Sequence, residues 1–233
     1  MQTELDAEIV EWVGRIGAAG AGHVMARFGM GRSWAYARLS RLLADGLLEQ
    51  RTLLYRQPGL YVATTTGLRW RGLERLPKCR VSPGAFEHAW ELATAAVELH
   101  ALMPGWRQLS EREIRMVEAE RGDPFASARV GERPGGSPAL HRPDLALVGR
   151  GGRVVAVEVE LSVKASRRLE AICRGYARAR HLHHVYYLAA SAAGRAVARA
   201  VSETRSVDRI TVLDLRDTRA LAAAERWEVS DAI

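Results

Sequence analysis

The sequence predicts an α/β fold, α+β overall, in two domains. A chain of 233 residues is long for one domain and long enough for two that each bury a core. The first third reads as helices followed by a strand hairpin, and after residue 143 strands alternate with helices. Residues 74–83 carry two prolines and three basic residues, as inter-domain segments often do. We expect domains over residues 1–76 and 85–233, with a linker over 77–84.

Composition excludes several classes of protein. Hydrophobic residues make up 48% of the chain and charged residues 26%, which is ordinary for a globular protein. No apolar run approaches the roughly 18 residues that a membrane helix needs, and the first residues lack the pattern of a signal peptide. Cys79 and Cys173 are isolated, so no disulfide framework or zinc spacing is present. We expect a cytoplasmic protein without a membrane partner.

Positive charge is concentrated near the beginning of the chain. Residues 13–83 hold 12 Lys and Arg against three acidic residues, whereas residues 84–233 hold 22 against 20. A local excess of this kind is typical of proteins that bind the phosphates of nucleic acid. A solubilising arginine-rich surface is the alternative. We favour double-stranded DNA as the partner.

Three helices are predicted in the first domain. Ile9, Val13 and Ile16 lie on one face of a helix over residues 8–18, a short helix covers 23–28, and Gly29-Met30-Gly31 separates it from a helix over 32–43. Two helices joined by a tight glycine-containing turn form a helix-turn-helix.

A strand hairpin follows these helices. LLEQRTLLY and LYVAT read as strands around the turn Arg56-Gln57-Pro58-Gly59, and Thr64 opens another helix. This order predicts an N-terminal winged helix-turn-helix, whose second motif helix enters the major groove. A protein–protein module is the alternative, and Trp34 could be a core residue. The expected DNA-contacting residues are Arg32, Ser33, Trp34, Tyr36, Arg38, Arg41, Arg51 and Arg56.

The second domain is expected to begin with a helix over 85–103. A capping box, Ser110 with Glu113, then opens another helix. Residues 121–141 are rich in Gly, Pro and Arg, and we interpret them as a long, partly mobile surface loop.

The stretch from His141 to Ala189 predicts the core of this domain. Strands over 143–148 and 153–161 form a hairpin, a helix covers 164–180, and HVYYLAA is the next strand. Helix, hairpin, helix and strand are the order of the PD-(D/E)xK core, so we expect a restriction-endonuclease-like α/β domain.

Three acidic residues mark the candidate site of this domain. Glu158 and Glu160 share one face of their strand by period-2 alternation, and Asp144 opens the neighbouring strand. Carboxylates in this arrangement would hold Mg²⁺ or Mn²⁺ for phosphodiester cleavage. The lysine usual two residues after the acid is replaced by Glu160, and Lys164 is the nearest substitute. The alternative is a solvated strand face, salt-bridged to Arg167 or Arg168.

The segments RPDLAL, VAVEVELSVKASRRLEAICRGYA and FEHAWELATAAVEL resemble the replication-relaxation family of bacterial plasmids and integrated conjugative elements. The resemblance covers nearly the whole chain and implies a winged helix followed by a nuclease-like domain. The residues that match the family's motifs are His88, Asp144, Glu158, Glu160, Lys164 and Tyr176.

The favoured function is therefore a DNA-binding regulator or accessory factor in plasmid replication or transfer. Two alternatives stay open: a Mg²⁺-dependent endonuclease (nickase) targeted by the winged helix, and a dimeric transcriptional repressor. A homodimer is compatible with all three, and no motif for a small-molecule ligand is evident.

Overall fold

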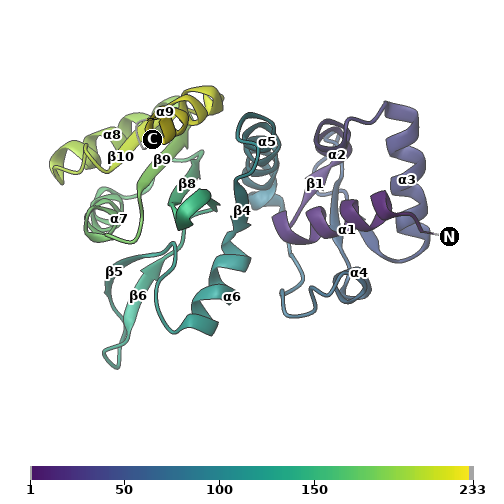
Figure 1. Cartoon of the computed structure of the whole chain (residues 1–233), viewed down its shortest axis with the longest axis horizontal. Helices are drawn as coiled ribbons and strands as arrows, with labels where there is room; N and C mark the ends of the chain where they lie inside the picture. Colours follow the sequence, from purple (N-terminus) through teal and green to yellow (C-terminus); the bar gives the residue numbers. More distant parts are fainter. Residues whose placement is uncertain (1, 231–233) are drawn as a thin grey trace. The chain divides into compact units, whose positions relative to one another are not determined.

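The computed structural model describes residues 2–230, with side chains up to residue 225, and has the α/β fold expected. The chain forms two compact units that divide between Ala101 and Leu102 (Figure 1). Within the described residues no helix has both the length and the apolar character to cross a bilayer.

The first unit combines helices with a small antiparallel sheet. Its strands lie in the order β1-β3-β2, with Ala19 opposite Tyr61 and Leu48 opposite Ala63. Ala19 and Gly20 form the two-residue strand β1 along one edge of β3. The elements up to the linker are α1 (Glu4–Ile16), β1 (Ala19–Gly20), α2 (Ala21–Phe28), α3 (Arg32–Ala44), β2 (Leu48–Arg51), β3 (Leu60–Ala63) and α4 (Thr65–Trp70).

The Thr64-x-x-Gly67 sequence fixes the start of α4. Thr64 is the N-cap, and its hydroxyl accepts the amide of Gly67 at 3.0 Å, which satisfies a donor that the helix leaves open. A Cβ on Gly67 would lie 2.1 Å from the carbonyl oxygen of Leu47, so only glycine lets α4 approach the residue before β2 this closely.

The helix after the linker belongs to the first unit. A 3₁₀ turn (Pro83–Ala85) leads into α5 (Phe86–Leu102), and its Phe86 and Trp90 pack with Leu60 and Val62 of β3. We expected the second domain to begin at residue 85, but the boundary lies after Ala101. The sequence predicted a helix here, but it did not show that the apolar residues of this helix pack on β3 of the first unit.

His23 provides a second, polar attachment for α5. Its Nδ1 accepts the amide of Gly20 at 2.9 Å, and its Nε2 is 3.0 Å from the hydroxyl of Thr94 on α5. The Thr94 hydroxyl in turn donates to the carbonyl of Trp90 at 3.1 Å, so it accepts from Nε2. Buried His23 is thus neutral with its proton on Nε2, because the other nitrogen is an acceptor.

The second unit is built on a five-stranded mixed sheet in the order β10-β9-β8-β7-β4. Strands β4, β7 and β8 pair antiparallel, and β8, β9 and β10 pair parallel. The bounds are β4 (Arg107–Ser110), α6 (Glu111–Arg121), β7 (Leu145–Val148), a 3₁₀ turn (Arg150–Gly152), β8 (Val154–Glu160), α7 (Ser166–Arg178), β9 (His184–Ala189), α8 (Ser191–Glu203), β10 (Ile210–Asp214) and α9 (Thr218–Ser230).

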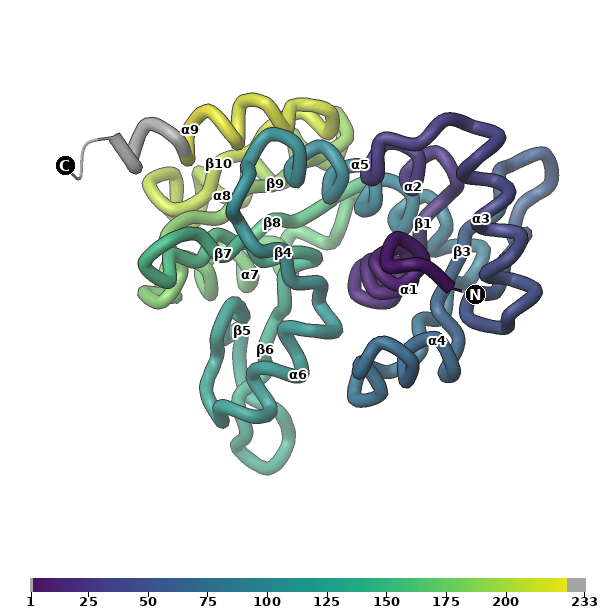
Figure 2. The backbone as a smooth tube through the Cα atoms, turned by 45° about the vertical axis from the view of Figure 1, so that its right-hand side comes forward, coloured from purple at the N-terminus to yellow at the C-terminus, as the bar shows by residue number. Residues whose placement is uncertain are grey.

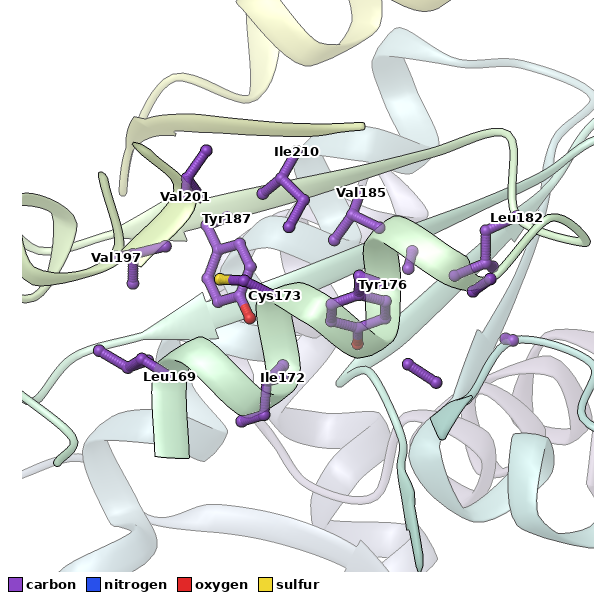
Figure 3. Close-up of a cluster of buried hydrophobic side chains, with 14 of the residues drawn as sticks. Leu169, Ile172, Cys173, Tyr176, Leu182, Val185, Tyr187, Val197, Val201 and Ile210 are labelled. Carbon is purple, nitrogen blue, oxygen red and sulfur yellow. The ribbon is translucent and has the colours of Figure 1, made fainter. Parts of the chain in front are cut away.

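The core of this unit lies between the sheet and the helices α7 and α8. Figure 3 shows Leu169, Ile172 and Cys173 of α7 in one buried cluster with Val185 and Tyr187 of β9. The buried residues of α7 recur at helical spacing and so form one inward face. The capping box of Ser110 and Glu113 at the start of α6 is also present.

Residues 121–141, expected as a mobile loop, instead contain a β-hairpin. β5 (Ala128–Glu132) pairs antiparallel with β6 (Pro138–His141), a ribbon that can be followed in Figure 2. Two of the four glycines that suggested a loop, Gly135 and Gly136, lie in its turn and have positive φ. The expectation of a loop was wrong because the glycine and proline content indicated the turn, whereas the short strands on either side of it have no clear pattern of their own.

Candidate functional site

The first turns of α3 present an arginine, a serine and two aromatic rings to solvent. Trp34 is 51% exposed and Tyr36 is 44% exposed, and the guanidinium of Arg32 lies 5.8 Å from the ring centre of Tyr36. Ser33 is also exposed, whereas Ala35 is buried. The N-cap, Gly31, has no side chain to bond the first amides of the helix. Trp34 is therefore a surface residue and not part of the core.

Two other arginines of α3 are held by a buried aspartate. Asp6 of α1 has no exposed surface, and its Oδ1 accepts from Arg38 at 2.7 Å while its Oδ2 accepts from Arg41 at 2.5 Å. Burial alone would raise the pKa of Asp6, but bonds from these arginines and from Thr3 hold that pKa below its usual range. Arg38 and Arg41, expected at the DNA, thus fix α3 against α1, although Arg41 keeps part of its side chain exposed.

Two further candidates lie on the β2–β3 hairpin, Arg51 at the end of β2 and Arg56 in the connection to β3. Arg51 pairs with Glu49 at 2.5 Å and is half-exposed. Arg56 is exposed beside Tyr55, whose side chain is 86% exposed, with its guanidinium 5.2 Å from the ring centre. Arg56 has φ of 59°, a left-handed conformation that is strained for any residue with a Cβ. The turn therefore displays an arginine where glycine would be the less strained residue.

Asp144 and Glu158 meet in the second unit because β7 and β8 are paired. Leu145 lies opposite Val157, so the next position outwards on each strand places Asp144 beside Glu158. The Oδ2 atom of Asp144 accepts the amide of Val159 at 2.8 Å. The pairing of β7 with β8, which the sequence predicted as a hairpin, therefore brings the two acids to neighbouring strand positions.

Glu158 is held by two side chains from outside its own strand. Its Oε1 accepts from Nε2 of His141, on β6, at 2.7 Å, and also from the hydroxyl of Tyr176, on α7. Burial alone would lower the pKa of His141, but the adjacent Glu158 carboxylate raises it above the usual value. Burial and the same carboxylate raise the pKa of Tyr176 well above its usual value. His141 therefore favours the charged form beside Glu158.

Glu160 forms an ion pair with Lys164, which follows β8 by four residues. Glu158 and Glu160 are only 3% and 4% exposed, because β8 is the central strand of the sheet and is covered on both faces. The alternative of a solvated strand face bridged to Arg167 or Arg168 is therefore wrong. Period-2 alternation predicted that the two acids share a face, but not that this face is buried.

Sequence reasoning missed three residues of this cluster. His141 was placed at the end of the supposed loop, and Tyr187 and Cys173 looked like ordinary core residues. Burial, followed by the charge of Glu158, raises the pKa of Tyr187 well above its usual value and that of Cys173 to about 11. The Tyr187 hydroxyl is buried without a hydrogen-bond partner among the described residues. β6 brings His141 to Glu158, and the parallel pairing of β8 with β9 places Tyr187 opposite Glu158.

The carboxylates of this cluster, which the sequence predicted to hold Mg²⁺ or Mn²⁺, are occupied by donors of the protein itself. One oxygen of Asp144 holds a backbone amide, one of Glu158 holds His141 and Tyr176, and Glu160 holds Lys164. In the part of the chain that the structure describes, no three His, Cys, Asp or Glu side chains are grouped as metal ligands. The expected metal ligands Asp144, Glu158 and Glu160 do not fit a shared ion in this arrangement, and we derive no metal-dependent step from them.

His88 lies on α5 and belongs to the first unit, whereas the other motif residues belong to the second unit. Of these, Tyr176 contacts Glu158. No protein-family model, curated protein or solved structure matches this chain.

Proposed function

We propose that this chain is a cytoplasmic protein that binds double-stranded DNA through its first unit, which is a winged helix with α3 as the recognition helix. The observation that carries the proposal is the exposed start of α3, where Arg32, Ser33, Trp34 and Tyr36 face solvent and residues 32–44 contain no acid. A globular unit has little reason to expose two large aromatic rings on one helix unless that face meets a partner.

The chemistry of this face suits DNA. The major groove admits an α-helix, and the N-terminal residues of that helix reach the base edges. Arg32 can bond guanine with two parallel donors, and the open amides after Gly31 can bond a phosphate. Arg56 and Arg51, on the hairpin next to this helix in the chain, are suited to phosphate contacts that position the protein without reading sequence.

The role of the chain within a cell follows from the resemblance in sequence. We propose a regulator or accessory factor of plasmid replication or transfer, in which the second unit contributes an α/β module with an internally paired acidic cluster. The endonuclease alternative stays a hypothesis. This hypothesis predicts that the wild type nicks supercoiled plasmid with Mg²⁺ or Mn²⁺ and that Asp144→Ala abolishes the nicking. If neither the wild type nor the variant nicks the plasmid, the endonuclease hypothesis is excluded.

Fluorescence anisotropy with a labelled duplex tests the DNA-binding proposal. Arg32→Ala and Trp34→Ala should each weaken binding about tenfold, the loss expected for about 1.4 kcal/mol of contact. The control is Arg69→Ala, an exposed arginine on α4, a helix that packs on α1 and β3 and should leave affinity unchanged. Equal affinities of all four proteins would exclude α3 as the binding surface.

A further inference from the structure

The second unit contains a cavity of about 490 Å³ between α7 and β5, outside the acidic cluster. The two walls touch at Gly175, where a Cβ would lie 2.7 Å from the carbonyl oxygen of Arg129. A volume of this size is within the range of small-molecule sites. The polar and charged residues that line it are Ser127, Arg129, Glu132, Arg174, Arg178 and His181.

A buried carboxylate holds the segment that forms the end of the cavity. Glu118 of α6 is 5% exposed, and its Oε1 accepts the amides of Phe125, Ala126 and Ser127 at 3.0, 3.2 and 3.0 Å. Its Oε2 lies 3.1 Å from Nε of Arg142. Three backbone amides and one ion pair therefore fix this wall before any ligand arrives, which lowers the entropy cost of binding.

The cavity is strongly basic. Three arginines and a histidine line it against one acid, Glu132. Arg129 pairs with Glu132 at 2.6 Å and Arg174 pairs with Glu170 at 2.9 Å, both at exposed positions where ion pairs contribute little and exchange readily for another anion. Arg178 is exposed and has no ion pair among the described side chains. The cavity thus offers up to three guanidinium groups to an anionic ligand.

A buried hydroxyl on the cavity wall lacks a hydrogen bond. Ser127 is fully buried, its carbonyl accepts from Nε2 of His181 at 3.0 Å, and its Oγ has no partner within the described part of the chain. An unsatisfied buried hydroxyl costs about 1–3 kcal/mol, so such groups in native proteins call for a ligand or water. A phosphate oxygen can accept hydrogen bonds from a hydroxyl and from neighbouring arginines together.

We propose that this cavity binds the phosphate group of a small phosphate ester, of about the size of a nucleoside monophosphate. The arginines bond the phosphate oxygens, Ser127 donates from the wall, and the apolar side chains of Val130 and Ala171 contact the organic part of the ligand. The proposal does not depend on DNA binding by the first unit, because every lining residue belongs to the second.

Isothermal titration of the full chain tests the site with deoxyadenosine 5′-monophosphate as the probe and adenosine as the control ligand. The monophosphate should bind saturably and adenosine should not. Arg178→Glu should weaken binding at least tenfold, whereas Arg168→Glu, an exposed arginine of α7 outside the cavity, should change it less than threefold. No saturable binding, or equal loss in the two variants, would overturn the proposal.

A second variant separates ligand binding from folding. Ser127→Ala removes a buried hydroxyl without a partner, so the melting temperature of the ligand-free protein should stay equal or rise while the affinity falls several-fold. Unchanged affinity would contradict the role of Ser127. A single-stranded tetrathymidylate in the same titration identifies the source of the phosphate. If it binds and Arg178→Glu abolishes that binding, the ligand is a phosphodiester backbone. If only the monophosphate binds in an Arg178-dependent manner, the ligand is a free phosphate ester.

Discussion

In the first unit the side chains of Arg32 and Arg56 are exposed and lack ion pairs among the described residues, whereas in the second unit Glu158 and Glu160 are buried and bonded within the protein. Exposed cations on a helix start and a turn remain free to bind an external polyanion. Buried acids that already hold His141 and Lys164 instead contribute to the fold of their own unit. Of these two sets of charged residues, only the exposed arginines of the first unit are available to a partner, although the acidic motif lies in the second.

The largest expected effect concerns where the first unit ends. A fragment of residues 1–101 should fold, whereas residues 1–76 should not form a stable unit, because loss of α5 uncovers Leu60 and Val62 and removes the His23–Thr94 bond. Circular dichroism during urea denaturation measures both fragments. A cooperative transition of the shorter fragment at the same urea concentration would show that α5 does not belong to this unit.

Substitution of Asp6, a buried carboxylate of the first unit, should lower the stability of the protein. Asp6→Asn should lower the free energy of unfolding by about 2–3 kcal/mol, because it leaves Arg38 and Arg41 without their anion and weakens the cap of α1. The pKa of Asp6 is lowered in the folded state, so its contribution is complete above its unfolded pKa of about 3.9 and is lost as pH falls through the folded value.

Urea denaturation followed by tryptophan fluorescence at pH 7 and pH 3 checks this effect. The difference between wild type and Asp6→Asn should be smaller at pH 3. Glu74→Gln, at an exposed position of the same unit, serves as the control and should change stability by less than about 0.5 kcal/mol at either pH. A difference that does not depend on pH would contradict the ion-pair explanation.

In the second unit, the hydroxyl of Tyr176 has a hydrogen-bond partner and that of Tyr187 has none among the described residues, so the two Phe variants can be compared. Tyr176→Phe removes the donor to Glu158 and should destabilise the unit by about 1–2 kcal/mol. Tyr187→Phe removes a buried hydroxyl without a partner among the described residues, so it should be neutral or stabilising. Thermal unfolding measures the stability of both variants. An equal loss of stability in the two would contradict the hydrogen bond from Tyr176 to Glu158.

Local patterns in the sequence predicted most of the elements and the meeting of Asp144 with Glu158. Alternation of side chains places Glu158 and Glu160 on one face, and helical spacing turns Leu169 and Tyr176 inward. These signals depend on residues a few positions apart, which is why they could be read directly.

Long-range pairing accounts for what was missed. His141 reaches Glu158 only because β6 pairs with β5 against α7, and Arg41 meets Asp6 across 35 positions of the chain. The partner of an exposed-looking arginine cannot be recognised from its own segment. The sequence therefore identified α3 as basic without showing which of its arginines stay available.

The salt dependence of duplex binding tests the account most directly. Wild type and the double variant Arg32→Glu/Arg56→Glu are titrated with a labelled duplex between 50 and 200 mM salt, about the range over which phosphate contacts change affinity steeply. We expect a steep loss of wild-type affinity with salt, and a double variant that binds at least tenfold more weakly with a slope shallower by about 1–2. Both proteins should unfold alike, because these arginines are exposed. Equal affinity and equal salt slopes would contradict the claim that this protein binds DNA through α3 and the adjoining hairpin.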